Sequence, residues 1–197
     1  MKHFVFIILV VVWHTTTYSQ IIDNPIPAEK SHADLIIKKI ELNPQFTIIH
    51  LSITNKITNG WFCADRNIYI KNSTGNEKFE IIKSEGIPTC PDQHQFKQIG
   101  EILNFKLIFP PLNQQIKTID IVEDCTDHCF YFKGVVLDNK QNQVFRLYEK
   151  GTQLYLAKDY TEAKKCFNEI INLVPDTQNE YNRSAQSYLT AILKLGK

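Results

Sequence analysis

Between residues 34 and 137, apolar side chains recur at every second position or in short unbroken runs. The alternation is clearest at Thr47, Ile49, Leu51 and Ile53, and a period of two places such residues on one face of a β-strand. Asparagine, glycine, proline and serine separate the runs, as turns require. The pattern predicts strands at residues 34–42, 46–54, 67–71, 79–84, 101–109, 116–123 and 130–137.

These segments follow one another without a helix-length segment between them, which favours antiparallel pairing over a parallel α/β sheet. We therefore expect a β-sandwich domain over residues 34–138, preceded by a linker at residues 20–33. We expect an immunoglobulin-like topology, with a small barrel as the alternative. The antibody-type signature is missing because Trp61 precedes Cys63 and does not lie on a strand between two core cysteines. The likeness is therefore architectural.

After Asp138 the period of the apolar positions lengthens to 3.6 residues, which predicts helices. Asp159 is suited to cap the second helix, because Glu162 follows three residues later as in a capping box, and Pro175 ends it. The predicted fold class is α+β: an antiparallel β-sandwich, then a helical hairpin plus one extra helix at residues 139–197. The apolar helical positions are Phe145, Leu147, Tyr148, Gly151, Leu154, Tyr155, Tyr160, Ala163, Phe167, Ile170, Ile171 and Leu173.

The first residues have the pattern of a signal peptide. A charged start precedes the apolar run at residues 4–13, and the small residues Thr17 and Ser19 are suited to cleavage between Ser19 and Gln20. A helix made of that run would reach about 15 Å, half of a hydrocarbon core of roughly 30 Å. The nearest downstream cysteine is Cys63, too far away for a lipid anchor. We expect a secreted or periplasmic protein without a stable membrane anchor.

Cysteine usage suits an oxidising compartment, because four cysteines lie in the predicted β-domain. Three pairings are open to them. We favour Cys63 with Cys90 and Cys125 with Cys129, although the second bond encloses only three residues and depends on local geometry. Cys166 lies in a predicted helix, where a buried free thiol acts as a small apolar group.

Residues 147–175 resemble a tetratricopeptide repeat. Leu147, Gly151, Tyr160, Ala163, Phe167 and Pro175 stand at its signature positions. A shift by the 34-residue period of the family carries Leu147 to Tyr181 and Gly151 to Ala185, so the last helix resembles the start of a second repeat. Lys150, Leu154 and Ile170 depart from the usual residues, as in a divergent terminal repeat. The resemblance covers about residues 142–197.

The resemblance implies that the first helix of each pair lines a groove that accepts peptides. The candidate binding residues that it implies are Phe145, Tyr148, Thr152, Tyr155, Asn182, Arg183 and Gln186. The competing interpretation is that Phe145, Tyr148 and Tyr155 pack against the sandwich. Since about three repeats are normally needed for stability, we expect the helices to dock on the β-domain or on a second copy of the chain.

One dense polar cluster lies at the end of a predicted strand and contains Asp120, Glu123, Asp124, Cys125, Asp127, His128 and Cys129. A zinc site would need paired Cys-x-x-Cys spacing, and a calcium site would need a glycine-containing loop with a terminal glutamate; neither spacing occurs here. We therefore interpret it as an acidic loop closed by a disulfide, and expect neither a metal nor another cofactor.

Composition and motifs limit the function. The 22 lysines and arginines are balanced by 21 aspartates and glutamates, so there is no basic field to hold a nucleic acid. No nucleophile elbow, metal-binding helix motif or phosphate loop occurs. We expect an exported, non-enzymatic protein–protein interaction or assembly factor that binds a protein or peptide, or self-associates, through the helices. The alternative is a metal- or thiol-dependent accessory protein or hydrolase with its site in the Cys125–Cys129 loop.

Overall fold

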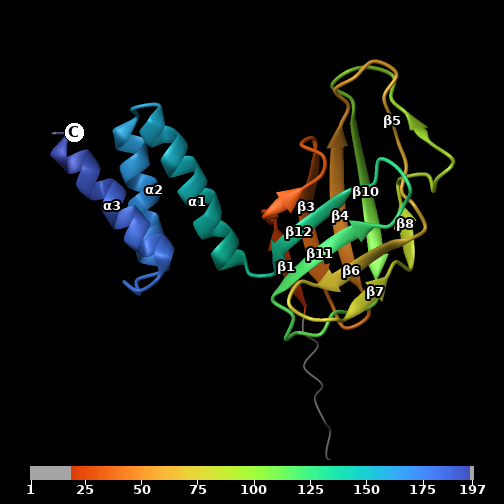
Figure 1. Ribbon diagram of the computed structural model, residues 1–197, viewed down its shortest axis with the longest axis horizontal. Helices are drawn as coiled ribbons and strands as arrows, with labels where there is room; N and C mark the ends of the chain where they lie inside the picture. The colour runs from red at the N-terminus through yellow and green to blue at the C-terminus, as the bar shows by residue number, and fades with distance from the viewer. Residues whose placement is uncertain (1–18, 196–197) are drawn as a thin grey trace, which may run out of the picture.

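The computed structural model describes residues 19–195, and consists of a β-rich N-terminal part and three helices in the C-terminal part (Figure 1). The α+β class is thus as predicted. The expected signal peptide lies outside the described residues, apart from Ser19.

Two five-stranded antiparallel sheets form the N-terminal part. The first has the order β1 (Gln20–Asp23), β3 (Leu35–Leu42), β4 (Thr47–Thr54), β10 (Ile102–Phe109) and β8 (Lys83–Glu85). The second has the order β2 (Glu29–Lys30), β12 (Tyr131–Val136), β11 (Thr118–Glu123), β6 (Ile68–Asn72) and β7 (Lys78–Glu80). A third sheet pairs only β5 (Trp61–Phe62) with β9 (His94–Gln95).

The core lies between the two large sheets and is continuous. Alternate residues such as Leu51 in β4 and Leu107 in β10 face it from one side, and Ile121 in β11 and Phe132 in β12 face it from the other. These side chains are at most 1% exposed. Since burying a side chain of this size stabilises a fold by about 1.5–3 kcal/mol, the period of two along the strands supplies the main driving force for this part.

Two of the predicted boundaries are wrong. Residues 20–33, expected as a linker, contribute β1 and β2 to the two sheets, and Ile22 in β1 is fully buried. The single strand expected at residues 79–84 is two strands in different sheets. The chain changes sheet between Ile81, whose N–H donates to Ile68, and Ile82, whose N–H donates to Ile108.

The three helices are α1 (Asn139–Leu156), α2 (Tyr160–Leu173) and α3 (Glu180–Lys194). Asp159 caps α2 by accepting a hydrogen bond from the Glu162 N–H, as predicted, and α2 ends two residues before Pro175. Gly151 lets α1 approach α2 closely, since a Cβ there would lie 2.9 Å from the Phe167 ring. The helices have a small core of their own around Phe167 and Ile170.

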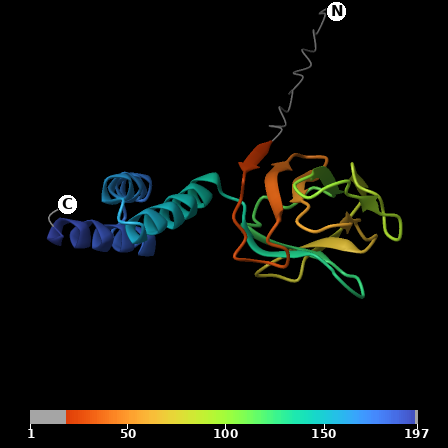
Figure 2. The ribbon, with the colours of Figure 1, turned by 90° about the horizontal axis from the view of Figure 1, so that it is seen from above.

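Three side chains on one face of α1 join the helices to the β-domain, and we call this contact the α1 junction. Asn139 bonds to the backbone of Ile21 and Asp23, and Arg146 donates to the carbonyls of Asp23 and Asn24. Asn142 is fully buried, accepts from the Ile26 N–H and donates to the Val136 and Asp138 carbonyls. Beyond these first turns, the helices extend away from the sheets in both views (Figures 1 and 2).

The expected docking of the helices on the β-domain is therefore limited to a polar contact. The apolar face of the hairpin is directed at α3 and not at the sheets. The position of the helices depends on backbone groups near residues 21–26, because polar side chains on one helical face match the carbonyls and N–H groups there.

We predict that Asn142→Ala lowers the free energy of unfolding by about 1–3 kcal/mol, because it leaves the N–H of Ile26 and the carbonyl of Val136 without their partner. Urea unfolding measures the loss, and amide hydrogen exchange should speed up at Ile26. The exposed neighbour Gln141→Ala is the control and should change stability by no more than about 0.5 kcal/mol. Equal effects of the two variants would contradict the role of the α1 junction.

Candidate functional site

The predicted aromatic residues of α1 contact α3. The ring of Phe145 lies 5.2 Å from that of Tyr181, Tyr148 lies 5.4 Å from Tyr181, and Tyr155 lies 5.0 Å from Tyr188. All of these rings are partly exposed. Edge-to-face and tilted ring pairs of this kind contribute packing energy beyond their buried area. The alternative that these side chains pack against the sheets is therefore wrong, and they form a half-exposed aromatic surface between two helices.

The remaining predicted binding residues differ in exposure. Arg183 and Gln186 are exposed on α3, where they line an open hollow of about 530 Å³ together with Ser187, Thr190, Ala191 and Lys194. Asn182 is fully buried and donates to the Val174 carbonyl, so it joins α3 to the end of α2. The Thr152 hydroxyl donates to the Tyr148 carbonyl within α1. The structure therefore leaves Asn182 no access to a ligand.

Both favoured disulfides are present, and they lie at the same end of the β-domain. Cys63 bonds to Cys90, and Cys125 bonds to Cys129. Cys63 follows β5 and Cys90 precedes β9, whereas the second bond closes the loop between β11 and β12. The bonded sulfurs are not free thiols, so the oxidised protein has no thiolate in this loop. Cys166 is buried and unbonded, as expected.

A cavity of about 810 Å³ lies at this end, and we call it the disulfide-end cavity. It is bounded by four segments that are distant in the sequence: residues 31–34, 53–65, 90–96 and 123–128. Only the last of these segments, the acidic loop, was a candidate site from the sequence, because the four are brought together only by the fold. A second signal was the pair of large apolar residues in a polar loop, Ile57 and Trp61, which are 64% and 45% exposed.

The wall formed by residues 55–60 is held by one buried side chain. Asn55 donates to the Gln98 carbonyl at 2.8 Å and accepts from the Ile57 N–H at 3.3 Å. Gly60 lies against this amide, and a Cβ at Gly60 would overlap the Asn55 Oδ1 atom. The Gly60 carbonyl accepts from the Phe96 N–H, which joins this wall to the opposite loop. The position of Trp61 is therefore determined by its neighbours.

Glu123 occupies the base of the acidic loop and is 7% exposed. One carboxylate oxygen accepts from the Asp65 N–H at 2.7 Å, and the other accepts from the Phe130 N–H at 3.0 Å. Burial raises the pKa of Glu123, and the two backbone bonds oppose that rise. Glu123 thus binds two cavity loops to each other.

Two histidines stand near each other at the cavity. Burial lowers the pKa of His32, and the nearby charge of His128 lowers it further. His128 lies inside the ring closed by Cys125 and Cys129, in a left-handed conformation with φ of 57°. That conformation is unfavourable for a side chain with a Cβ and is retained only where the surrounding structure requires it.

The metal alternative needs several ligand side chains to converge on one point. Residues 19–195 include no group of three or more histidine, cysteine, aspartate or glutamate side chains arranged to hold a metal ion. The acidic cluster predicted from the sequence is spread out: Asp120 accepts from Ser73 and Gly134 on the sheet, while Glu123 is engaged with backbone N–H groups. Over the same residues, no helix has the length and apolar character needed to cross a membrane.

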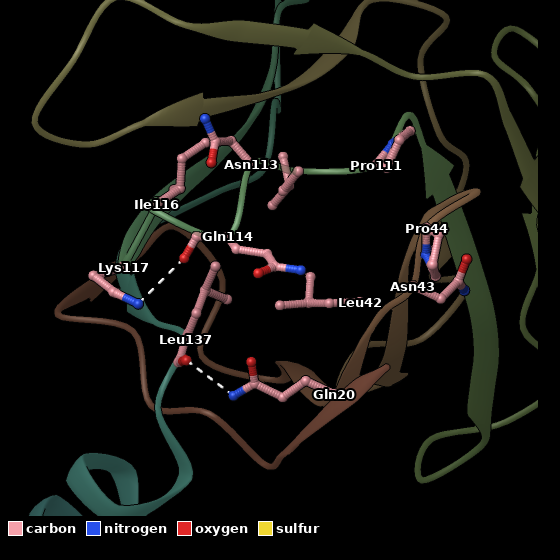
Figure 3. Close-up of a pocket in the computed structure, with 11 residues that line it drawn as sticks. Gln20, Leu42, Asn43, Pro44, Pro111, Asn113, Gln114, Ile116, Lys117 and Leu137 are labelled. Carbon is pink, nitrogen blue, oxygen red and sulfur yellow. Dashed lines mark hydrogen bonds between the residues drawn. The ribbon is translucent and has the colours of Figure 1, made fainter. Parts of the chain in front are cut away.

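A smaller hollow of about 220 Å³ lies at the opposite end of the β-domain (Figure 3). Leu42, Pro44, Pro111 and Ile116 are among its lining residues. The side-chain amide of Gln20 donates to the Leu137 carbonyl at 3.3 Å across it, which joins the start of β1 to the segment that leads into α1. This hollow belongs to the connection between the β-domain and the helices.

Comparison of the chain with protein-family models, with curated proteins and with solved structures found no match.

We predict that burial of Glu123 makes the β-domain less stable as the pH rises. The folded state holds the proton more tightly than the unfolded chain, whose pKa is the ordinary 4.5, so stability is lost from that pH up to the raised pKa. Urea unfolding of the wild type and Glu123→Gln from about pH 4 to about pH 7 should show the wild type losing stability relative to the variant.

Glu85→Gln is the control with the opposite sign. A hydrogen bond from Lys83 lowers the pKa of Glu85, so the wild type should lose stability relative to this variant as the pH falls below 4.5. If Glu123→Gln and the wild type keep a constant difference over the whole range, the buried carboxylate does not titrate as described.

We predict that Gly60→Ala destabilises the protein by about 1–3 kcal/mol, because the new Cβ must displace the Asn55 amide. The exposed Thr58→Ala in the same loop is the control and should be nearly neutral. Thermal unfolding measures both effects. A neutral Gly60→Ala would show that the loop adapts and does not hold Trp61 in one position.

Proposed function

We propose that this protein is an exported, non-enzymatic interaction or assembly factor that binds a protein or peptide partner through α1 and α3. The observation that carries the proposal is the way the helices are attached. Within residues 19–195, the helices bond to the β-domain through the first turns of α1 alone, so the aromatic surface between α1 and α3 stays accessible. Aromatic side chains supply large contact areas with little loss of rotamer freedom, which suits a binding surface.

We interpret the helices as one and a half tetratricopeptide-like repeats. The small residues Gly151 and Ala185, 34 positions apart, are both buried. α2 lies between α1 and α3 in the sequence and contacts both helices, as expected of a helix that is shared by two repeats. In this interpretation α1 and α3 are equivalent first helices, which is why their exposed sides are the candidate binding surface.

We further interpret the β-domain as immunoglobulin-like. If β3, β4, β8 and β10 are strands A, B, D and E, their order in the first sheet is A-B-E-D. The remaining order β12-β11-β6-β7 then corresponds to G-F-C-C′. This correspondence concerns architecture and carries no function with it.

Export is supported by the two disulfides, because such bonds persist in oxidising compartments and are rare in the cytosol. The same bonds argue against the thiol-dependent alternative, since both cysteines of the acidic loop are used. The proposal therefore assigns that loop a role in the shape of the β-domain.

The test reverses charge on the exposed side of α3. We expect Arg183→Glu with Gln186→Glu to reduce partner capture from the native host about tenfold or more, because both residues are exposed on α3 and line its open hollow. Lys165→Glu with Asn168→Glu, at the same spacing on the exposed side of α2, makes an identical change in charge and should leave capture intact.

Circular dichroism should show the same helix content and melting temperature in both double variants. Light scattering of the wild type over a range of concentrations tests whether the partner is a second copy of the chain. If both variants capture the same proteins as the wild type, and light scattering gives all three the same oligomeric state, the helices are not the binding surface.

A further inference from the structure

The disulfide-end cavity has an apolar wall whose largest side chains are too exposed to contribute much to the core. Trp61 and Ile57 are large and exposed at its edge, while Phe62 and Phe96 beneath them are buried. The Cys63–Cys90 disulfide and Pro91 extend the same wall. An apolar surface that is gathered in a concave site marks a binding site more often than scattered exposed residues do.

The charges in the cavity have one predominant sign. Asp34, Asp65, Glu123 and Asp127 line it, against the single ammonium group of Lys56. Lys56 lies 3.9 Å from Asp34, and both oxygens of Glu123 are bonded to backbone N–H groups. Asp65 accepts from the Asn67 N–H at 2.9 Å through Oδ1 only, so Asp65 and Asp127 are the carboxylates that keep capacity for a ligand. Asp127 is 79% exposed in its side chain and lies 3.3 Å from His128.

The wall also has backbone groups that suit an extended chain. Trp61 and Phe62 form β5, which within the described residues pairs only with β9. A two-stranded sheet leaves one edge of each strand without a ladder partner, and an extended peptide adds to such an edge through main-chain hydrogen bonds. A small amine would use the carboxylates but not this edge.

We propose that the disulfide-end cavity binds an extended basic peptide segment of a partner protein, with an apolar side chain against Trp61 and Ile57 and a flanking lysine or arginine directed to Asp65 and Asp127. This site is at the opposite end of the β-domain from α1. It does not depend on the function proposed for the helices.

The test uses the fluorescence of Trp61. The chain has two tryptophans, so Trp13→Phe in the full chain leaves Trp61 as the only tryptophan, and selective excitation of tryptophan then reports on Trp61. The probes are three blocked peptides of equal length, Gly-Lys-Leu-Lys-Gly, Gly-Ser-Leu-Ser-Gly and Gly-Glu-Leu-Glu-Gly. We expect the lysine peptide to shift the emission in a saturable way and to bind about tenfold more tightly than the glutamate peptide, with the preference reduced by salt.

Asp65→Asn with Asp127→Asn should weaken the lysine peptide by about two- to fivefold for each carboxylate removed. The matched control is Asp92→Asn with Asp124→Asn, which removes the same charge at exposed positions that do not line the cavity. A distinct effect of the first pair supports a site inside the cavity. An equal effect of both pairs overturns the proposal, because the peptide would then respond to overall charge.

Two further results would also overturn it. If all three peptides bind equally, the carboxylates do not select the ligand. If Trp61 responds to chitohexaose or cellohexaose but to none of the peptides, the cavity is a glycan site. Loss of partner capture through α3, with peptide binding intact, would separate this site from the one proposed on the helices.

Discussion

The buried side chain of Asn142 determines how the two parts of this protein are joined. It accepts from Ile26 and donates to Val136 and Asp138, so it binds α1 to the connection between the edge strands β1 and β2 and to the end of β12. A buried amide contributes little net energy when it is satisfied but destabilises a fold strongly when its partners are missing. The hydrogen bonds of the α1 junction therefore fix the orientation of α1 relative to the sheets, although the junction is a polar contact.

This polar junction leaves the apolar surfaces of the helices to one another. The sheets do not cover the aromatic side chains of α1. Their rings pack against α3 and stay half-exposed, as seen at Phe145, Tyr148 and Tyr155. A helical pair that buried these rings on the β-domain would have had no accessible aromatic surface. The same constraint that fixes the direction of α1 thus preserves the surface proposed for partner binding.

The two candidate sites lie at opposite ends of one strand. The acidic loop of the disulfide-end cavity comes directly before β12, and α1 follows shortly after it. The six residues of β12 separate them by about 20 Å at 3.3 Å per residue. This arrangement keeps the two proposed sites apart, one on the helices and one at the cavity.

The period of the apolar residues was sufficient to predict most of the elements. The strands around Ile49 and Leu107 and the cap at Asp159 are determined by interactions within a few residues, so the sequence contains them directly. The cysteine count left three disulfide pairings open, and the favoured one is present. The strand β1 was missed because Pro25 and Pro27 interrupt the alternation around it, and because its partner β3 is distant enough to leave no local signal.

By itself, the sequence determined the class of the fold, the change from strands to helices at Asp138, and part of each core, such as Leu51 in the sheets and Phe167 in the helices. Tertiary structure alone decided that Asn182 is buried, that the chain crosses between sheets at Ile81, and that four loops enclose one cavity. The physical reason is range. Periodicity and capping act between near neighbours, whereas a cavity arises only when distant segments are brought together by the packing of the two sheets.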